Sequence, residues 1–287
     1  MASSQPCSPT QLFNSLLWDY LIIDLRPIQE YDEGHFDRAQ PLQDGVTASA
    51  SGLRPFEAPE LADHIYLYAG EDGGDGAVAI GERVMQAVEL CLRSFRRPRD
   101  RQDVAVYWVS GGYPAIQAQF PFACTSSPEC VPGAIYPQVV AAYAAGVIAI
   151  AGQGIAADTA MLRRLGITHV VNCTTDVTNY AEGQGVVYHR VRIEDEESAR
   201  LGGHLPAAVA FIQQAHRQGG SVLVHCMRGV SRSAAVVVAC IVAAQGLTVN
   251  DAVQALRESR DICRPNAGFM RQLCAFQQEQ AAAAIAR

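Results

Sequence analysis

The sequence predicts an α/β protein of two domains, each with a mainly parallel central sheet flanked by helices. Three observations predict this fold class. A chain of 287 residues is long for one domain and short for three. Short apolar runs alternate with amphipathic segments in both halves, which is the pattern of parallel sheets. Residues 125–133 are rich in Ser, Pro and Gly and are interpreted as a linker. We therefore expect one domain over 10–124 and another over 134–280.

In the first half, three apolar runs are predicted to be strands, at residues 20–25, 65–68 and 104–109. Residues 77–95 place apolar side chains at helical spacing, so a helix is predicted between the second and third strands.

The second half repeats this alternation. Short apolar segments there predict strands at 169–172, 186–193 and 221–225. Segments with helical spacing predict helices at 156–165, 206–217, 232–245, 249–257 and 268–279.

The composition excludes several classes of protein. Apolar residues make up 49% of the chain and charged residues 18%, which argues against wholesale disorder. The apolar stretches are too short for a membrane span and the N-terminus lacks a signal peptide, so we expect no membrane partner and a cytoplasmic location, with the nucleus as a second possibility. A net charge of −7 disfavours nucleic acid as a partner. Nine cysteines without a CxxC pair argue against a disulfide framework and a zinc knuckle and indicate reduced thiols.

The most informative segment is VLVHCMRGVSRS, residues 222–233. A strand leads into Cys226, five residues follow, and Arg232 stands where an apolar helix begins. Backbone N–H groups of 227–232 can surround an oxyanion, the helix N-terminus adds its dipole, and Arg232 can bind two phosphoryl oxygens. The same groups favour the thiolate form of Cys226, which predicts a nucleophile for phosphorus.

A buried structural role is the ordinary explanation for a free cysteine, and we adopt it for Cys173 and Cys240. For Cys226 the whole pattern His-Cys-x-x-Gly-x-x-Arg-Ser needs an explanation. Its chance occurrence in a chain of this length is on the order of one in ten thousand or less, which favours the catalytic interpretation.

The stretch from His225 to Ser233 resembles the Cys-x5-Arg phosphate loop of the dual-specificity protein phosphatases. Residues 165–172, LGITHVVN, resemble an early helix–strand segment of that family. Residues 260–273, RDICRPNAGFMRQL, resemble its C-terminal stretch and depart from it around Ile262 and Cys263. The resemblance covers roughly 134–280. It implies hydrolysis of phosphotyrosine and phosphoserine or phosphothreonine through a cysteinyl-phosphate intermediate, without a cofactor.

The resemblance also implies a general acid about 30 residues before the cysteine, and Asp195 occupies that place. The alternative for this stretch is a solvated loop, because Glu194, Glu196 and Glu197 flank Asp195. Ser233 is expected to hydrogen-bond the sulfur and to assist breakdown of the intermediate.

The remaining site residues receive supporting roles. His225 either orients the loop or is an ordinary core histidine, and Asn266 is expected to brace the loop. The Arg228 side chain either faces the mouth of the pocket or lies in solvent. The predicted phosphate-binding residues are Met227, Arg228, Gly229, Val230 and Ser231.

In the first half, residues 22–36 and 109–113 resemble the opening and the late strand and turn of a rhodanese-like domain, covering roughly 10–124. A sulfur-transferring rhodanese places a cysteine directly after its central strand. Here the strand at 65–68 is followed by Ala-Gly-Glu-Asp, so we expect a non-catalytic domain.

A rhodanese-like domain before a dual-specificity phosphatase domain is the layout of the MAP kinase phosphatases and of the serine/threonine/tyrosine-interacting-like proteins. The layout implies a phosphoprotein substrate, with a MAP kinase as one candidate. The region that would dock a kinase, 39–56, holds only Arg54, although a second cluster of arginines lies within 93–101. The first 133 residues contain nine arginines and 18 acidic residues, a balance that argues against docking to an acidic groove.

Two functions of different classes stay open. The main hypothesis is a metal-independent protein phosphatase. The alternative is a phosphoprotein-binding pseudophosphatase or scaffold, for which Cys226 and Arg232 would serve only as a phosphate cradle. Hydrolysis of RNA triphosphates is less favoured, because the second half carries a balance of only +2. Neither the oligomeric state nor a disulfide from Cys226 to Cys173 or Cys263 is decided by the sequence.

Overall fold

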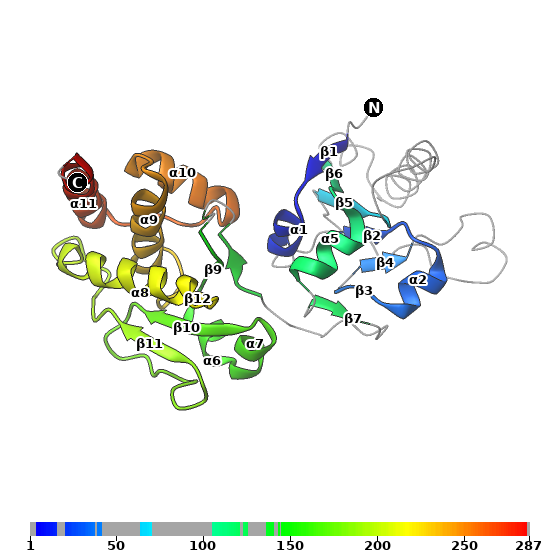
Figure 1. Cartoon of the computed structure of the whole chain (residues 1–287), viewed down its shortest axis with the longest axis horizontal. Coiled ribbons are helices and arrows are strands. Elements are labelled where there is room, and N and C mark those ends of the chain that lie inside the picture. The colour runs from blue at the N-terminus through cyan, green and yellow to red at the C-terminus, as the bar shows by residue number, and fades with distance from the viewer. Residues whose placement is uncertain are drawn as a thin grey trace. The chain divides into compact units, whose positions relative to one another are not determined.

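The chain divides into two compact units, Met1–Ile135 and Tyr136–Arg287, each of them α/β as predicted (Figure 1). The computed structural model describes residues 4–15, 21–37, 39–41, 64–70, 105–120, 123–125, 136–140, 143 and 145–285. The predicted helix at 77–95, the arginine cluster within 93–101 and all of the predicted linker except Thr125 lie outside these residues.

The first unit contains a parallel five-stranded sheet in the order β1-β6-β5-β2-β4. A short antiparallel pair, β3 with β7, is separate from it. The strands of this unit are β1 (Ser4–Cys7), β2 (Leu21–Asp24), β3 (His35–Phe36), β4 (Ala39–Pro41), β5 (His64–Tyr68), β6 (Ala105–Val109) and β7 (Cys124–Thr125). Its described helices are α1 (Pro9–Ser15), α2 (Ile28–Glu33) and α5 (Gly112–Gln119).

The three predicted strands of the first half are present as β2, β5 and β6. The edge strands β1 and β4 were not predicted, because each is short and contains a proline that weakens the strand signal. Their pairing with a neighbouring strand decides their conformation, and an edge position tolerates proline because one side of the strand needs no partner.

The second unit has a five-stranded sheet in the order β11-β10-β12-β9-β8, parallel except for the antiparallel edge pair β8–β9. Its strands are β8 (Gln138–Val139), β9 (Ile148–Ala151), β10 (Ile167–Asn172), β11 (Val187–Arg190) and β12 (Ser221–His225). Its helices are α6 (Gln153–Ala157), α7 (Thr159–Arg164), the 3₁₀ turn η3 (Gly202–His204), α8 (Leu205–Arg217), α9 (Arg232–Gln245), α10 (Val249–Ser259) and α11 (Ala267–Ile285).

The prediction of one helix over 156–165 is wrong, since two helices, α6 and α7, occupy this region. Asp158 separates them with a non-helical backbone, and its Oδ1 accepts a hydrogen bond from Met161 N at 2.9 Å. This is an N-cap, which starts a new helix. The strand predicted at 186–193 is shorter, because only Val187–Arg190 pair with β10. Strand β9 was not predicted, since all four of its residues are buried and show no alternation.

Alternate residues of β12 face the two layers that cover this sheet. Val222 and Val224 pack with residues of α8, α9, α10 and α11, whereas Leu223 packs with residues of α6 and α7 on the opposite face. Helix α9 is buried from Arg232 to Val242. Full burial of one such aliphatic side chain is worth about 1.5–3 kcal/mol. The end of β12 and the start of α9 are therefore fixed by packing, and they fix both ends of the loop between them.

Among the described residues, no single helix has the length and apolar character to cross a membrane. One pair, α9 with α10, meets the length and composition criteria together but bends by 116° at its junction.

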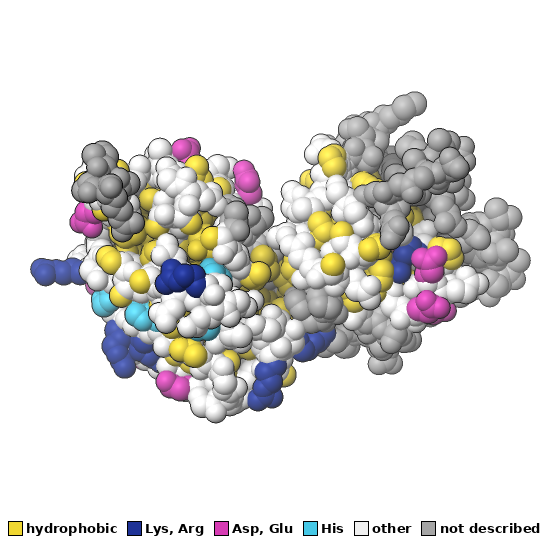
Figure 2. All heavy atoms as spheres, viewed as in Figure 1, with side chains coloured by type: hydrophobic (Ala, Val, Ile, Leu, Met, Phe, Trp, Pro, Cys, Tyr) yellow, Lys and Arg dark blue, Asp and Glu magenta, His cyan; other side chains and the backbone are white. Residues whose placement is uncertain are grey.

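Figure 2 shows arginine and histidine side chains together at the surface of the second unit, near α8.

Candidate active site

The candidate active site is the loop 226–231, which joins the buried strand β12 to the N-terminus of α9. In open α/β sheets, ligands bind at the carboxyl ends of the strands, and this loop lies at such an end. Cys226 is 1% exposed and follows directly on the last residue of β12. The sequence pattern that predicted a phosphate loop thus has the strand–loop–helix setting that it requires.

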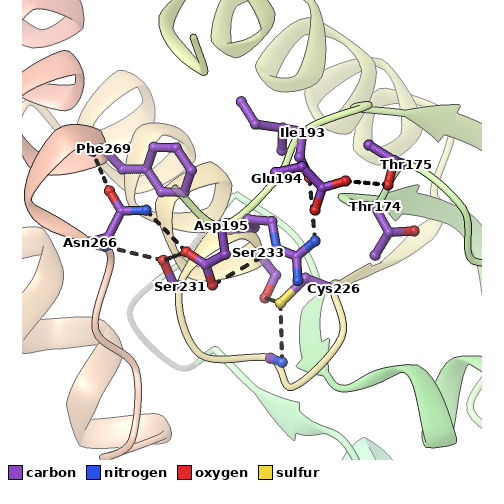
Figure 3. A network of polar contacts seen from close by, with 12 residues as sticks. Thr174, Thr175, Ile193, Glu194, Asp195, Cys226, Ser231, Ser233, Asn266 and Phe269 are labelled. Carbon is purple, nitrogen blue, oxygen red and sulfur yellow. Dashed lines mark hydrogen bonds and ion pairs between the residues drawn. The ribbon is translucent and has the colours of Figure 1, made fainter. Parts of the chain in front are cut away.

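The sulfur of Cys226 receives several hydrogen bonds from the loop and from α9 (Figure 3). Ser233 Oγ donates to Sγ at 3.3 Å and the Gly229 amide at 3.2 Å. Burial raises the pKa of the Cys226 thiol, but hydrogen bonds from the Ser233 hydroxyl and from the amides of Ser233, Val230 and Arg228 together lower it below the ordinary value for cysteine. The loop therefore stabilises a thiolate, as the sequence predicted.

Gly229 is required by the shape of this loop. Its φ is +70°, which side chains rarely adopt. A Cβ at this position would lie 2.6 Å from the carbonyl carbon and oxygen of Ala151, at the end of β9. The loop can curl inward only because no side chain separates it from that strand.

Arg232 begins α9 and is 8% exposed. Its Nη1 donates to Ile193 O at 3.3 Å, and its Nε lies 3.9 Å from Asp195 Oδ2. The buried Nε makes no hydrogen bond within the part of the chain that the structure describes. A buried donor without a partner is costly, and an oxyanion held by the loop amides would satisfy it.

Asp195 comes to the phosphate loop from the loop that follows β11 (Figure 3). Its Oδ1 accepts hydrogen bonds from Ser231 Oγ at 2.5 Å and from Asn266 Nδ2 at 3.0 Å. Its side chain is 39% exposed, so water reaches it. This carboxylate is therefore held beside Arg232 and the phosphate loop.

The neighbouring carboxylates have other partners. Glu194 accepts a hydrogen bond from Thr175 Oγ1 at 2.6 Å, and Glu197 forms an exposed ion pair with Arg271 at 3.3 Å. Glu196 is exposed. Of the four acidic residues in this stretch, the structure brings Asp195 to the phosphate loop, which favours it as the acid.

Ser231 and Asn266 have a joint role. Ser231 is the residue before α9, yet its hydroxyl makes no helix cap. Instead it donates to Asp195 and accepts from the backbone N–H of Asn266 at 3.1 Å. Asn266 was predicted to brace the loop, and its contacts agree with that role. Because Ser231 does not cap the helix, the Ser233 amide in the first turn of α9 donates to the Cys226 sulfur instead.

The other predicted residues lie in the same loop. Val230 O accepts from the amide of Arg264 at 2.7 Å. The Met227 and Arg228 side chains are exposed, so Arg228 fits both of its predicted alternatives. His225 is buried, and burial lowers its pKa to about 4, partly opposed by a hydrogen bond with the Cys226 backbone. A neutral core histidine next to the loop agrees with both roles proposed for it.

Two further thiols, Cys173 and Cys263, lie near enough to Cys226 for its negative charge to change their pKa. Burial raises the pKa of Cys173, and the negative charge of Cys226 raises it further. Burial likewise raises the pKa of Cys263 to about 12, with a contribution from Cys226. Both remain protonated thiols at neutral pH, so Cys226 differs from them in reactivity although all three are buried.

Two side chains that support the loop had no role in the sequence analysis: Arg260 contacts the loop, and Gln138 contacts Arg260. Arg260 donates from Nε to Gly229 O at 3.0 Å and from Nη2 to Arg228 O at 3.2 Å. Its Nη1 also donates to Gln138 Oε1. Arg260 stands in the quoted C-terminal stretch, which was the available signal, whereas nothing in the sequence connected Gln138 to the site.

Within the described part of the chain, no group of three or more His, Cys, Asp or Glu side chains has the arrangement of a metal site. The prediction of a metal-independent reaction stays a prediction.

Comparison with known proteins places these features in a family. The model of the dual specificity phosphatase catalytic domain matches residues 150–279. A mouse chain assigned as a dual specificity phosphatase, solved with zinc tungstate, is 33% identical. The two structures superpose with a TM-score of 0.50, over 55% of this chain and 98% of the mouse chain.

Two curated relatives add to this. The human protein phosphatase Slingshot homolog 3 is 42% identical over 122 residues, which are 42% of this chain but only 18% of the human protein. A Dictyostelium discoideum protein assigned as a rhodanese domain-containing dual specificity protein phosphatase is 29% identical over 213 residues. They cover 72% of this chain and 44% of that protein, so the similarity reaches into the first unit and supports the rhodanese-like layout. The thiolate loop, its arginine and these relatives together show that the chain belongs to the dual-specificity phosphatase family.

Proposed function

We propose that this chain is a Cys-dependent phosphatase that hydrolyses phosphotyrosine and phosphoserine or phosphothreonine in proteins. The observation that carries the proposal is the juxtaposition of three groups. The Cys226 thiolate lies within the loop, and the buried Arg232 has an unsatisfied Nε. Asp195 is held beside them by a hydrogen bond from Ser231 of the loop and another from Asn266. The tungstate in the mouse relative is a tetrahedral oxyanion, which supports phosphate as the ligand.

In the first step the Cys226 sulfur would attack phosphorus in line with the leaving oxygen. The S–P bond forms as the P–O bond to the substrate breaks. The loop amides and Arg232 would stabilise the charge on the three equatorial oxygens. Protonated Asp195 would donate its proton to the leaving tyrosyl, seryl or threonyl oxygen. A cysteinyl-phosphate and a free hydroxyl result.

In the second step a water molecule would attack the phosphorus of the intermediate. Asp195, now a carboxylate, would accept the proton of that water. The sulfur leaves as a thiolate, and the Ser233 hydroxyl, 3.3 Å from Sγ, stabilises the charge that returns to it. Inorganic phosphate is released and the free enzyme is restored.

The proposal is tested by hydrolysis of para-nitrophenyl phosphate and of a peptide phosphorylated on both residues of a Thr-x-Tyr motif, in EDTA and reductant. Cys226→Ser should abolish turnover, because an alkoxide is not available at neutral pH. Cys274→Ser is the matched control, since Cys274 is exposed on α11. Unchanged turnover in Cys226→Ser would refute the proposal.

The scaffold alternative makes a different prediction for Asp195. A phosphate-binding module does not need an acid, so the Asp195→Ala variant of a scaffold should bind the phosphopeptide as the wild type does. In an enzyme the same variant should turn over more slowly. Its rate should also no longer decline at alkaline pH, because the group that must be protonated to donate has been removed. A wild-type protein that binds the phosphopeptide without turning it over would establish the scaffold.

A MAP kinase is the finer candidate for the substrate. The two-unit layout supports it, whereas the acidic balance of the first 133 residues speaks against docking to an acidic groove. The test compares kcat/KM for an intact doubly phosphorylated MAP kinase with that for its isolated phosphopeptide. A docking enzyme should prefer the intact kinase, and equal values would remove this candidate.

A further inference from the structure

Residues 260–266, which connect α10 to α11, run along the outer side of the phosphate loop; we call them the bracing segment. Hydrogen-bond donors of this segment bind successive carbonyl oxygens of the loop. The bonds are Arg260 Nη2 to Arg228 O at 3.2 Å, Arg260 Nε to Gly229 O at 3.0 Å and Arg264 N to Val230 O at 2.7 Å. One further carbonyl, that of Met227, accepts from Gln153 N at 3.1 Å. The loop carbonyls are therefore held from outside, one after another.

The direction of these carbonyls fixes the direction of the loop amides. In a planar trans peptide, the C=O of one residue and the N–H of the next point in opposite directions. When Arg228 O is held outward, the Gly229 amide points inward, and it donates to Cys226 Sγ at 3.2 Å. The same relation connects Gly229 O with the Val230 amide, another donor to the sulfur. Bonds on the outer side thus orient the donors on the inner side.

One side chain makes two of these outer bonds. The Arg260 guanidinium binds the carbonyls of Arg228 and Gly229 through different nitrogens. Its third nitrogen donates to Oε1 of Gln138, which is 3% exposed and lies on the edge strand β8. The planar guanidinium presents these donors at fixed angles, whereas a lysine ammonium is a single point charge on a flexible stem.

We propose that Arg260 is a positioning residue for the phosphatase reaction: it turns two peptide units of the phosphate loop so that their amides face the sulfur and the phosphoryl oxygens. This inference rests on the proposed function and extends it. Arg260 need not touch the substrate, since its donors are directed to the loop carbonyls and to Gln138.

A purely electrostatic role is the competing explanation, because any cation near Cys226 favours its thiolate. The two explanations differ for Arg260→Lys. Lysine keeps the charge but cannot hold both carbonyls and Gln138 at once. If geometry matters, the lysine variant resembles Arg260→Met; if charge alone matters, it resembles the wild type.

The experiment uses the full chain with Arg260→Lys and Arg260→Met. The control is Arg163→Met, which removes a positive charge from α7, where the exposed Arg163 donates to Gln184. Circular dichroism confirms that each variant is folded. Alkylation of Cys226 by iodoacetamide is followed by mass spectrometry of its peptide from pH 5 to 9. Hydrolysis of para-nitrophenyl phosphate gives kcat and KM separately.

Both Arg260 variants should lower kcat/KM by about tenfold or more, with the loss mainly in kcat, since misdirected amides stabilise the transition state poorly. Alkylation should require a higher pH, and the control should match the wild type. A lysine variant equal to the wild type in both measurements overturns the inference. If the Arg260 variants do not fold, Gln138→Met, which removes the partner of Nη1, should shift alkylation in the same direction, and an unchanged profile would overturn the inference.

The alkylation measurement separates this inference from the proposed function. It requires a thiolate but no turnover. If the wild type does not hydrolyse phosphate esters, the proposed function fails while the alkylation profile still reports whether Arg260 orients the loop.

Discussion

At the scale of single residues, hydrogen bonding separates Cys226 from the other cysteines. Burial raises the thiol pKa of Cys7, Cys173 and Cys263 as it does for Cys226. Among the described cysteines with a shifted pKa, only Cys226 has a pKa below the ordinary value. The hydroxyl and amide groups that donate to its sulfur outweigh the effect of burial. Reactivity at this position is therefore a property of the loop and of Ser233.

Replacement of Ser233 tests that view. Ser233→Ala removes the hydrogen bond from the Ser233 hydroxyl, which contributes most to lowering the pKa of Cys226. The thiolate should therefore form only at a higher pH. Since a hydrogen bond to a charged group contributes roughly 1.5–3 kcal/mol, kcat should fall by about tenfold or more. Rapid-quench detection should show cysteinyl-phosphate accumulating, because the leaving thiolate has lost its donor. Ser221→Ala, at the other end of β12, is the control, and equal behaviour of the two variants would contradict the assigned role.

At the scale of elements, the site is assembled from segments that are distant in the sequence. The phosphate loop (226–231) follows β12, and the loop that carries Asp195 (191–201, here called the acid loop) follows β11. The bracing segment precedes α11. Two close backbone approaches occur in this assembly, and both require glycine. Gly229 lies against the end of β9, and Gly268 at the start of α11 lies against the backbone of Glu197.

Gly268→Ala should move the acid loop without affecting the nucleophile. A Cβ at this position would lie 2.0 Å from Glu197 O and 2.6 Å from its carbonyl carbon, so the loop that carries Asp195 must shift. We expect kcat to fall by about tenfold or more, because the acid loses its position, while the pH profile of Cys226 alkylation stays as in the wild type.

The control for this variant is Gly203→Ala, whose added Cβ would meet nothing within 4 Å. Alkylation that changes together with kcat in Gly268→Ala would show that the substitution disturbs the phosphate loop instead. Full activity would show that the acid loop tolerates the shift.

At the scale of the whole molecule, the chain consists of two units, each with its own five-stranded sheet. Every residue assigned to the site lies within Tyr136–Arg287, including Gln138 on β8. In the first unit, burial raises the pKa of the described thiols Cys7 and Cys124. The expectation of a non-catalytic domain stays a prediction.

The second unit should therefore act on a small substrate without the first. A fragment of residues 134–287 should fold and hydrolyse para-nitrophenyl phosphate with kcat/KM within about threefold of the full chain, since the site and its core are complete in it. Circular dichroism and steady-state kinetics provide the measurement. A folded but inactive fragment would show that the first unit contributes to catalysis.

Acid should weaken the second unit, because several of its histidines are held neutral. Burial lowers the pKa of His225 to about 4, and it also lowers those of His169 and His189. Above pH 6.5 the histidine is neutral in both the folded and the unfolded chain. Below that value only the unfolded chain takes up the proton, so stability falls as the pH drops toward 4.

For His225 this loss amounts to about 2 kcal/mol between pH 7 and pH 5. Urea unfolding followed by circular dichroism at both pH values should show that His225→Gln reduces the pH dependence by a similar amount. An identical pH dependence in the variant and the wild type would mean that His225 is not held neutral.

The sequence predicted much of the fold and most of the site residues, and its errors have identifiable causes. Strands β2, β5, β6, β10 and β12 were predicted because each is a run of apolar residues bounded by polar ones. Strands β1, β3, β4, β7, β8 and β9 were missed, because tertiary pairing rather than local composition makes them strands. One helix was predicted where Asp158 caps a second, α7. Gln138 was missed, because a single buried amide on an edge strand leaves no sequence signal.

The sequence by itself determined the chemistry of the phosphate loop. Cys226, Gly229 and Arg232 lie within seven residues, so their spacing is a local property that a strand–loop–helix unit converts directly into a cradle. The tertiary structure decided which carboxylate faces that cradle and what holds it in shape. Asp195 and Arg260 lie about 30 residues before and after the loop. Their contacts depend on how α10, α11 and the sheet pack, which no local pattern specifies.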